Sequence, residues 1–466
     1  MLMTLIQKEI MHHILSVRFV ALLVMCLLLV PLTLSINYRN YRQNLVDYQQ
    51  AVKLANIEET TMNPGMSLDP ELEVSKLLLK PTALSVFANG LADVLPSYLG
   101  MTRNGVTQGA PALVSSLSYM LGHLDFLFVV GTVFSLLALL FTFDAVAGER
   151  EAGTLRITLA NSLPRDLFLW SKLIGGYVVF VVPFLVSLLF GLLILVWQGF
   201  PLGEPEIFPR VLGLTLISLL YIGVFFAIGT VISTYLDNSK TALIIAFTVW
   251  VFAVLITPRL GFLAAKFIAP TQTSQSVYME KTAMRDDFNA ALKEEQNKMI
   301  MEIPLNEKGH RHIGGEVSRK ITERMKLFEA EYRSKFLNHS NTLDRNYKRE
   351  IERQEQVGQM LSRLTPTSSL IYITTNLTQT GKGKRSTYFQ TGDNYYEMLY
   401  TDLFSKIIDY TYSRQDRPVK ITQPPSVEIT TLGETLRQSA IDVMLLCFFA
   451  VILTTVAFLK FFRSDI

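Results

Sequence analysis

The chain has 466 residues, of which 50% are hydrophobic and 18% are charged, and its formal net charge at pH 7 is +3. An ordinary soluble protein carries about 25% charged residues, so this composition indicates an integral membrane protein with a substantial soluble part. The small net charge, and a sequence without a basic, aromatic-interleaved segment, argue against a nucleic-acid-binding surface.

The first 13 residues place apolar side chains such as Leu5 and Ile6 next to the charged Lys8. Residues 1–13 therefore predict an amphipathic helix that lies along the membrane surface. Residues 14–36 follow as an apolar run that reaches the roughly 20 residues needed to cross a bilayer. A secretory signal peptide is the alternative, but this run is too long for one and no small-residue cleavage site follows it.

Five further apolar runs are long enough to cross a membrane. They predict spans at 124–147, 167–198, 211–236, 241–259 and 438–462, with external segments at 37–123 and 260–437. We therefore expect an all-α polytopic membrane protein with six transmembrane helices. Both large polar segments lie on the same side of the membrane in this arrangement.

The external segment at 260–437 has helical periodicity in its middle. Apolar residues repeat every three or four positions at Met284, Phe288 and Leu292, and again from Val317 to Phe336. Gly314 and Gly315 separate the two stripes, so we expect a long helical hairpin within a large, mainly helical extracytoplasmic domain. The aromatic residues from Tyr388 to Phe404 are interpreted as part of the core of that domain.

The connection at 148–166, between the second and third spans, is densely charged. Its charged residues are Glu149, Arg150, Glu151, Arg156, Arg165 and Asp166. Leu155, Leu159 and Leu163 recur every four residues, so one face of a short helix would be apolar, and Pro164 ends that helix. The pattern predicts a short amphipathic helix to which a soluble partner can bind. An ordinary solvated loop is the alternative.

The same stretch resembles the signature of ABC-2-type permeases, the membrane subunits of a class of ABC transporters. The matching residues are Gly148, Glu149, Arg150, Glu151, Gly153, Thr154, Leu155, Leu159, Ala160, Pro164, Arg165 and Lys172. In that family the motif begins the cytoplasmic coupling helix, where the ATPase subunit docks. The resemblance implies that Glu149 and Arg150 contact the ATPase and that Gly153, which lacks a side chain, allows close approach.

The full set of residues to which the resemblance assigns a role in ATPase coupling is Gly148, Glu149, Arg150, Glu151, Gly153, Thr154, Leu155, Arg165 and Lys172. A second stretch is similar to a bacterial subgroup of these permeases that has a large external insert between the fifth and sixth spans. That similarity rests on residues 364–367, the apolar helix after them, and the aromatic pairs at 388–389 and 395–396.

The sequence contains no motif for catalysis or nucleotide binding. The run at 381–386 has glycines and lysines but not the spacing of a phosphate-binding loop, and no hydrolase signature is found. Cys26 and Cys447 lie in apolar runs and the histidines are scattered, so we expect no disulfide framework and no metal site. The chain is predicted not to be an enzyme and to carry no cofactor. ATP and Mg are expected in a partner ATPase.

The distribution of positive charge predicts the orientation of the chain. Nine basic residues fall on the side of the termini: Lys8, Arg18, Arg150, Arg156, Arg165, Lys172, Lys240, Lys460 and Arg463. The short loop on the opposite side holds Arg210 alone, while long segments cross largely regardless of charge. Both termini and residues 148–166 are therefore expected in the cytoplasm. The resemblance to a bacterial subgroup of permeases implies that the membrane is the inner membrane of a bacterium.

Two functions remain open on these grounds. The first is the permease subunit of an ATP-driven ABC exporter, assembled with two ATPase copies and a second permease chain that is identical or paralogous. The alternative is a force-transmitting ABC membrane subunit, whose external domain acts on a periplasmic or envelope partner and which carries no cargo. A proton-coupled carrier is not favoured, because the ionisable residues of the apolar runs fall near span ends.

Overall fold

The computed structural model describes residues 2–57, 61–62, 73–102, 105–110, 124–160, 164–302, 315–401, 419–420, 422–427 and 430–463. Within these residues the chain is mainly helical. It divides into two compact units, of which unit 1 is Met1–Ile256 with Thr365–Ile466 and unit 2 is Thr257–Leu364.

Among the described residues, six helical runs are long and apolar enough to cross a membrane, which confirms the predicted mainly helical, six-span protein. They are α2 (Val17–Ile57), α4 (Phe126–Phe128) with η2 (Val129–Phe134) and α5 (Ser135–Thr142), α8 (Arg165–Trp197), α9 (Ile207–Tyr235), α10 (Ser239–Trp250) with η3 (Val251–Ile256) and α11 (Thr257–Ile268), and α17 (Leu432–Arg463). η2 and η3 are π-helical turns within the second and fifth runs. The first run continues well beyond residue 36, where the sequence alone placed the end of the first span.

The core of unit 1 is built around interlocking phenylalanines of the second, third and fourth runs. Phe134 lies edge-on to Phe180 and Phe184, with ring centroids 6.2 and 5.5 Å apart. Phe180 in turn meets Phe226 edge-on at 5.5 Å. Aromatic rings favour this geometry because the positive edge of one ring meets the negative face of the other. The helices that carry the candidate site are fixed to this core.

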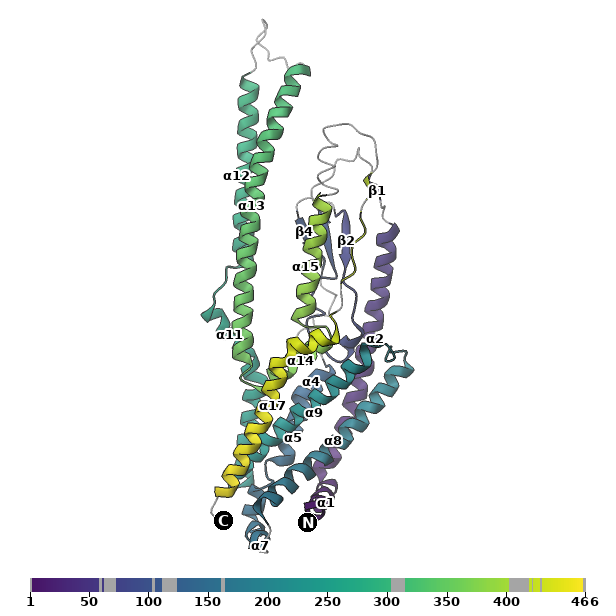
Figure 1. Ribbon diagram of the computed structural model, residues 1–466, viewed down its shortest axis with the longest axis vertical. Coiled ribbons are helices and arrows are strands. Elements are labelled where there is room, and N and C mark those ends of the chain that lie inside the picture. Colours follow the sequence, from purple (N-terminus) through teal and green to yellow (C-terminus); the bar gives the residue numbers. More distant parts are fainter. Residues whose placement is uncertain are drawn as a thin grey trace. The chain divides into compact units, whose positions relative to one another are not determined.

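Unit 1 also contains a small antiparallel sheet, which the sequence analysis did not predict. The strands β2 (Ser75–Leu78), β3 (Tyr98–Thr102) and β4 (Gly105–Gln108) are ordered β2-β3-β4, and η1 (Ala83–Val86) lies between the first two in the chain. Ser75 pairs with Met101 and Leu78 with Tyr98. Helix α15 (Lys382–Leu399) lies beside the sheet (Figure 1) and packs Tyr388 and Tyr395 against Leu77 and Leu99. A separate two-residue pair joins β1 (Thr61–Met62) to β5 (Val419–Lys420).

Arg210 holds three helices of unit 1 together. It lies in the first turns of α9, where its side chain is 1% exposed. It donates to the carbonyl oxygen of Leu377 (3.1 Å), the last residue of α14 (Pro366–Leu377), and to the hydroxyl of Thr435 (3.2 Å) on α17. It also donates to the carbonyl oxygen of Thr430 (2.6 Å), just before α17. It also donates to Glu206 at 3.1 Å. Arg210, which the sequence placed in a short loop, is thus a buried residue that connects helices. Helix α9 begins at Ile207, before residue 211, the expected start of the fourth span.

Unit 2 consists of α11, α12 (Ser274–Met301) and α13 (Gly315–Ser362). The pairs Lys281–Asp344 (2.6 Å) and Arg324–Glu295 (3.5 Å) show that α12 and α13 run antiparallel, because the later residue of α12 meets the earlier residue of α13. Phe288 and Tyr332 stack between them, with ring centroids 5.8 Å apart. The side chain of Val317, in the second predicted stripe, and the residue Gly314, in the predicted break between the stripes, lie outside the described part of the chain.

Candidate functional site

Two short helices, α6 (Ala147–Glu151) and α7 (Thr154–Ala160), form the connection between the second and third membrane runs. The start of α6 is fixed by a side chain from another helix, since the hydroxyl of Ser233 on α9 accepts from the backbone N–H groups of Val146 (2.9 Å) and Ala147 (3.0 Å). Helix starts leave backbone donors without intrahelical partners, so Ser233 both satisfies these groups and anchors α6 to α9.

Gly153 makes the turn between α6 and α7. Its backbone φ is +74°, in the left-handed region that side-chain-bearing residues rarely adopt. No described atom lies within 4 Å of the position that a Cβ would take. Within the chain, therefore, Gly153 is required by its backbone angle, and the space around it is open. Gly148 is less constrained, because a Cβ there would make ordinary contacts at 3.5 Å with Asp144 and Ser239.

The apolar face of α7 packs against membrane helices. Leu155 is 1% exposed and belongs to a buried cluster with Phe168 and Leu169 of α8 and with Phe461 of α17; Leu159 packs at its edge. The rings of Phe168 and Phe461 stack with centroids 5.7 Å apart. Leu163 lies outside the described residues. At the start of α8, Arg165 donates to the carbonyl oxygen of Phe462 at 2.9 Å, which adds a second link to α17.

An ion network joins α6, α8 and α1 (Leu2–Ile14). The ammonium of Lys172 on α8 lies 2.8 Å from a carboxylate oxygen of Glu149 and 3.1 Å from one of Glu9. The Lys172 side chain is 10% exposed, and that of Glu9 is buried as well. The hydroxyl of Thr154 donates to the second oxygen of Glu149. Charges that are removed from water in this way need close partners, so the three helices depend on one another at this point.

Helix α1 approaches α8 closely at Gly175. A Cβ at that position would lie 2.8 Å from the Cβ of Glu9, closer than two such carbons can come. Further along α1, His13 stacks on Phe141, with ring centroids 5.6 Å apart. Burial lowers the pKa of His13 below its usual value; the neighbouring charges of Glu9 and Lys172 act in opposite directions.

The other end of the site is tied to the connection between α9 and α10. Arg150 donates to the carbonyl oxygen of Thr234 (3.1 Å) and to the carboxylate of Asp237 (3.0 Å). Glu151 accepts from the backbone N–H of Ser239 at 3.0 Å, at the first residue of α10. These contacts bind α6 to a turn more than 80 residues away in the sequence.

The nine residues assigned by the motif differ in their surroundings. Glu149, Arg150, Glu151, Arg165 and Lys172 contact other parts of the chain through their side chains, and Leu155 is buried. Glu151, Gly153 and Thr154 are exposed, and Gly148 is half-buried. Sequence reasoning did not single out Ile157, which is 66% exposed. The sequence could have indicated Ile157, because it is an apolar residue that falls outside the leucine stripe of the predicted amphipathic helix. A cavity of about 320 Å³ between α1, α7 and α8 has Ile157, Lys8 and His12 among its lining residues.

Six candidate membrane helices among the described residues, with a pair of short helices bound to several of them, define a multi-pass membrane protein. Over residues 3–466 the chain matches the family model described as ABC-2 family transporter protein, and it belongs to that family. Membrane subunits of this family generally pair with separate ABC ATPases and are typically non-catalytic themselves. A search of curated proteins gave no match.

Proposed function

We propose that this chain is the permease subunit of an ATP-driven exporter in the inner membrane of a bacterium, with both termini in the cytoplasm. A separate ATPase subunit, present in two copies, binds ATP and Mg. A second permease chain, identical or paralogous, completes the transporter. The role of this chain is then to convert a push from the ATPase into movement of its membrane helices.

The observation that carries this proposal is the set of contacts made by α6 and α7. Within two short helices, Leu155 packs on α8 and α17, Glu149 pairs with Lys172 of α8, and Arg150 binds the turn after α9. Lys172 extends the network to α1 through Glu9. A force applied to the exposed side of α7 is therefore shared among several membrane helices at once, which an isolated solvated loop would not achieve.

The contacts also divide the motif by task. Five exposed residues of this connection form the surface offered to the ATPase: Glu151, Gly153, Thr154, Arg156 and Ile157. Glu149, Arg150, Arg165 and Lys172 transmit its movement through ion pairs and hydrogen bonds. Gly148 lies within the first helix, and Leu155 holds the second against the membrane helices.

The test is a matched pair of substitutions, Ile157→Glu and Val94→Glu. The two side chains are 66% and 65% exposed, so each variant places a charge where an apolar side chain already meets solvent. Purification through a C-terminal tag should recover an ATPase with wild type and Val94→Glu, and lose it with Ile157→Glu.

Glu149→Arg should retain the ATPase but uncouple its activity from the permease. Equal recovery of the ATPase with Ile157→Glu would refute this docking surface.

The structure of unit 2 favours a second candidate, the force-transmitting subunit. Its hairpin is stiffened along its length, because ion pairs link α12 and α13 at Lys281 and Arg324. At its base Gly261 of α11 packs on the backbone of Ser362, where a Cβ would come within 2.6 Å of an amide nitrogen. A stiff hairpin built on the last turns of the fifth membrane run is suited to transmit movement to another protein.

Replacing residues 285–340 of the hairpin with a short flexible linker separates the two candidates. A force transmitter should then keep its ATPase and its coupled ATP hydrolysis but lose an envelope partner that wild type recovers by chemical cross-linking. An exporter that uses only the membrane helices should show the same partners as wild type. The control is Leu327→Ser, which changes an exposed side chain of α13 and leaves the hairpin intact.

A further inference from the structure

Strand β2 has one edge that no other strand covers among the described residues. It pairs with β3 on one side, and the order β2-β3-β4 leaves its other side at the margin of the sheet. The N–H of Leu79, next after β2, donates to Ser97 at 2.9 Å, on the side of β3. Backbone groups alternate in direction along a strand, so the N–H and C=O groups of Lys76 and Leu78 are directed towards the free edge.

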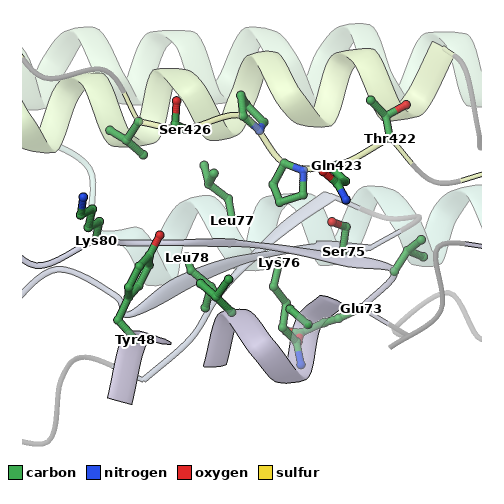
Figure 2. Close-up of a pocket in the computed structure, with 16 residues that line it drawn as sticks. Tyr48, Glu73, Ser75, Lys76, Leu77, Leu78, Lys80, Thr422, Gln423 and Ser426 are labelled. Carbon is green, nitrogen blue, oxygen red and sulfur yellow. The ribbon is translucent and has the colours of Figure 1, made fainter. Parts of the chain in front are cut away.

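An extended segment, Thr422 to Val427, runs alongside this edge (Figure 2) without forming a strand with it. Its start is fixed by the hydroxyl of Tyr395, which donates to the carbonyl oxygen of Thr422 at 2.6 Å. Its end is fixed by Val427, which packs on the cluster beneath α15. In the middle of this segment, Pro424 and Pro425 have no backbone N–H and cannot complete a ladder with β2.

A groove of about 300 Å³ lies between β2 and this segment, and α2 contributes Tyr48 and Val52 to it (Figure 2). Its long direction follows the strand from Ser75 to Lys80. The groove therefore offers a row of backbone donors and acceptors on one side and proline rings on the other. This combination suits an extended chain that can pair with a strand edge while its other side packs on apolar rings.

Two lysines and one acid, Lys76, Lys80 and Glu73, are the charged residues that line the groove among the described residues. Glu73 is already engaged, because it accepts from Thr107 at 2.8 Å and lies 3.6 Å from Lys76. Lys80 is exposed, and its backbone oxygen accepts from Lys384 at 3.1 Å. Burial, and then the charge of Lys80, lower the pKa of Lys384 to about 8. Lys80 lines this end of the groove, and its charge makes the end a favourable place for a carboxylate.

We propose that this groove binds an extended, acidic peptide segment of another protein, which adds as a strand to the free edge of β2 and places its carboxylates near Lys80. The site is separate from α6 and α7, and its existence does not depend on the exporter assignment. If the termini are cytoplasmic, the groove faces the outside and its partner is an envelope protein.

The experiment uses the full-length chain in detergent and two fluorescein-labelled nonapeptides. Both alternate threonine and valine, and they end in two glutamates or in two lysines. Fluorescence anisotropy should show tighter binding of the acidic peptide. Leu78→Pro removes one outward N–H, so it should weaken binding about tenfold, as expected for the loss of a hydrogen bond and its pairing geometry. Leu78→Ala keeps the N–H and should bind within a few-fold of wild type. Lys80→Glu should reverse the preference between the two peptides.

Hydrogen exchange supplies a readout that does not depend on the peptide sequence chosen. The amides of Lys76 and Leu78 should exchange fast in the free protein and slowly with the acidic peptide. The inward amides of Leu77 and Leu79 should stay protected in Leu78→Pro, which shows that the β2–β3 ladder persists in that variant. Equal binding by Leu78→Pro and Leu78→Ala overturns the proposal. So does no binding of either peptide, or slow exchange at Lys76 and Leu78 before peptide is added.

Discussion

Lys172 carries its positive charge to the point where α1, α6 and α8 meet, and the carboxylates of Glu9 and Glu149 face it from two sides. Neither carboxylate alone explains why a lysine is tolerated there, since an amine removed from water is costly without partners. The two carboxylates together compensate the charge of Lys172. Through them, Lys172 on α8 is bound to both α1 and α6. Movement of α6 therefore changes the environment of α1 through one side chain.

Lys172→Met should destabilise the protein by about 2–3 kcal/mol. Breaking a buried ion pair costs about 3–5 kcal/mol, and the loss here should be at or below the lower end of that range because Glu149 keeps contact with water. The methionine leaves two carboxylates without their cation. The apparent Tm, followed by tryptophan fluorescence at a fixed scan rate, should fall. Adding Glu9→Gln and Glu149→Gln should restore most of the loss, because the uncompensated charges are then gone. Additive losses in the triple variant would contradict the network. Lys298→Met, at an exposed pair, is the control.

The pH dependence of α1 docking should follow His13. Its pKa in the folded protein lies below the ordinary 6.5 because burial disfavours the charged form, so folding favours the neutral ring. The corresponding stability is complete above about pH 6.5 and is lost as the pH falls through the lowered pKa of His13. The charged groups nearest the ring are Glu9, His12, Lys172 and Asp144.

The measurement is apparent Tm between pH 7.5 and pH 5. Wild type should lose stability over the lower part of this range. His13→Phe keeps the stacking on Phe141 but cannot be protonated, so its curve should be flatter. His12→Phe, at the exposed neighbouring position, should retain the wild-type slope. A wild-type slope in His13→Phe would show that another group controls the transition.

At the scale of elements, the association of α1 with α8 rests on small residues as well as charge. Gly175 permits the two helices to approach until the missing Cβ would clash with Glu9 at 2.8 Å. Gly175→Ala should therefore push α1 away from α8 and lengthen the Glu9–Lys172 pair, with little effect on membrane insertion. Limited trypsin digestion at Lys8 should become several-fold faster. Gly223→Ala, where a Cβ would meet Tyr177 at 3.7 Å, should digest like wild type.

The helices of this protein could be predicted from sequence because each carries its own signal. The six apolar runs exceed the length needed to cross a bilayer, and the leucines of α7 mark a face that is found packed against α8 and α17. The sheet has no comparable signal. Its strands are four or five residues long, and β2 and β3 are stabilised by Tyr388 and Tyr395, about 300 residues away in the chain.

The same reasoning separates the parts of the candidate site. The motif located α6 and α7, but not which of its residues face inward. Glu149 is held by Lys172, and Arg150 by the residues around Asp237, and such partners cannot be read from local periodicity. Arg210 is a parallel case, because the sequence analysis placed it in a short loop between two spans. Its actual partners, Leu377 and Thr430, come from distant parts of the sequence.

For the whole molecule, an even number of membrane helices requires both termini to lie on one side. The basic residues that flank the short connections on that side include Arg150, Arg156 and Lys240, and positive charge near span ends favours the cytoplasm. The two long polar segments do not weigh against this assignment, because large domains cross largely independently of charge.

A reporter that is fluorescent only in the cytoplasm tests this orientation when it is placed at four positions. Fusion after Ile466 and insertion after Asn161 should fluoresce, since both positions belong to the side that carries the positive connections. Insertion after Gly203, between α8 and α9, and insertion after Gly314, in unit 2, should remain dark. The insertion at Gly203 is the control for the insertion at Gly314. Both positions are expected on the side opposite the termini, but Gly203 lies in a short loop, so its result does not depend on the large unit 2. Fluorescence at Gly203 with a dark Ile466 fusion would invert the topology, and α6 and α7 would then face away from any cytoplasmic ATPase.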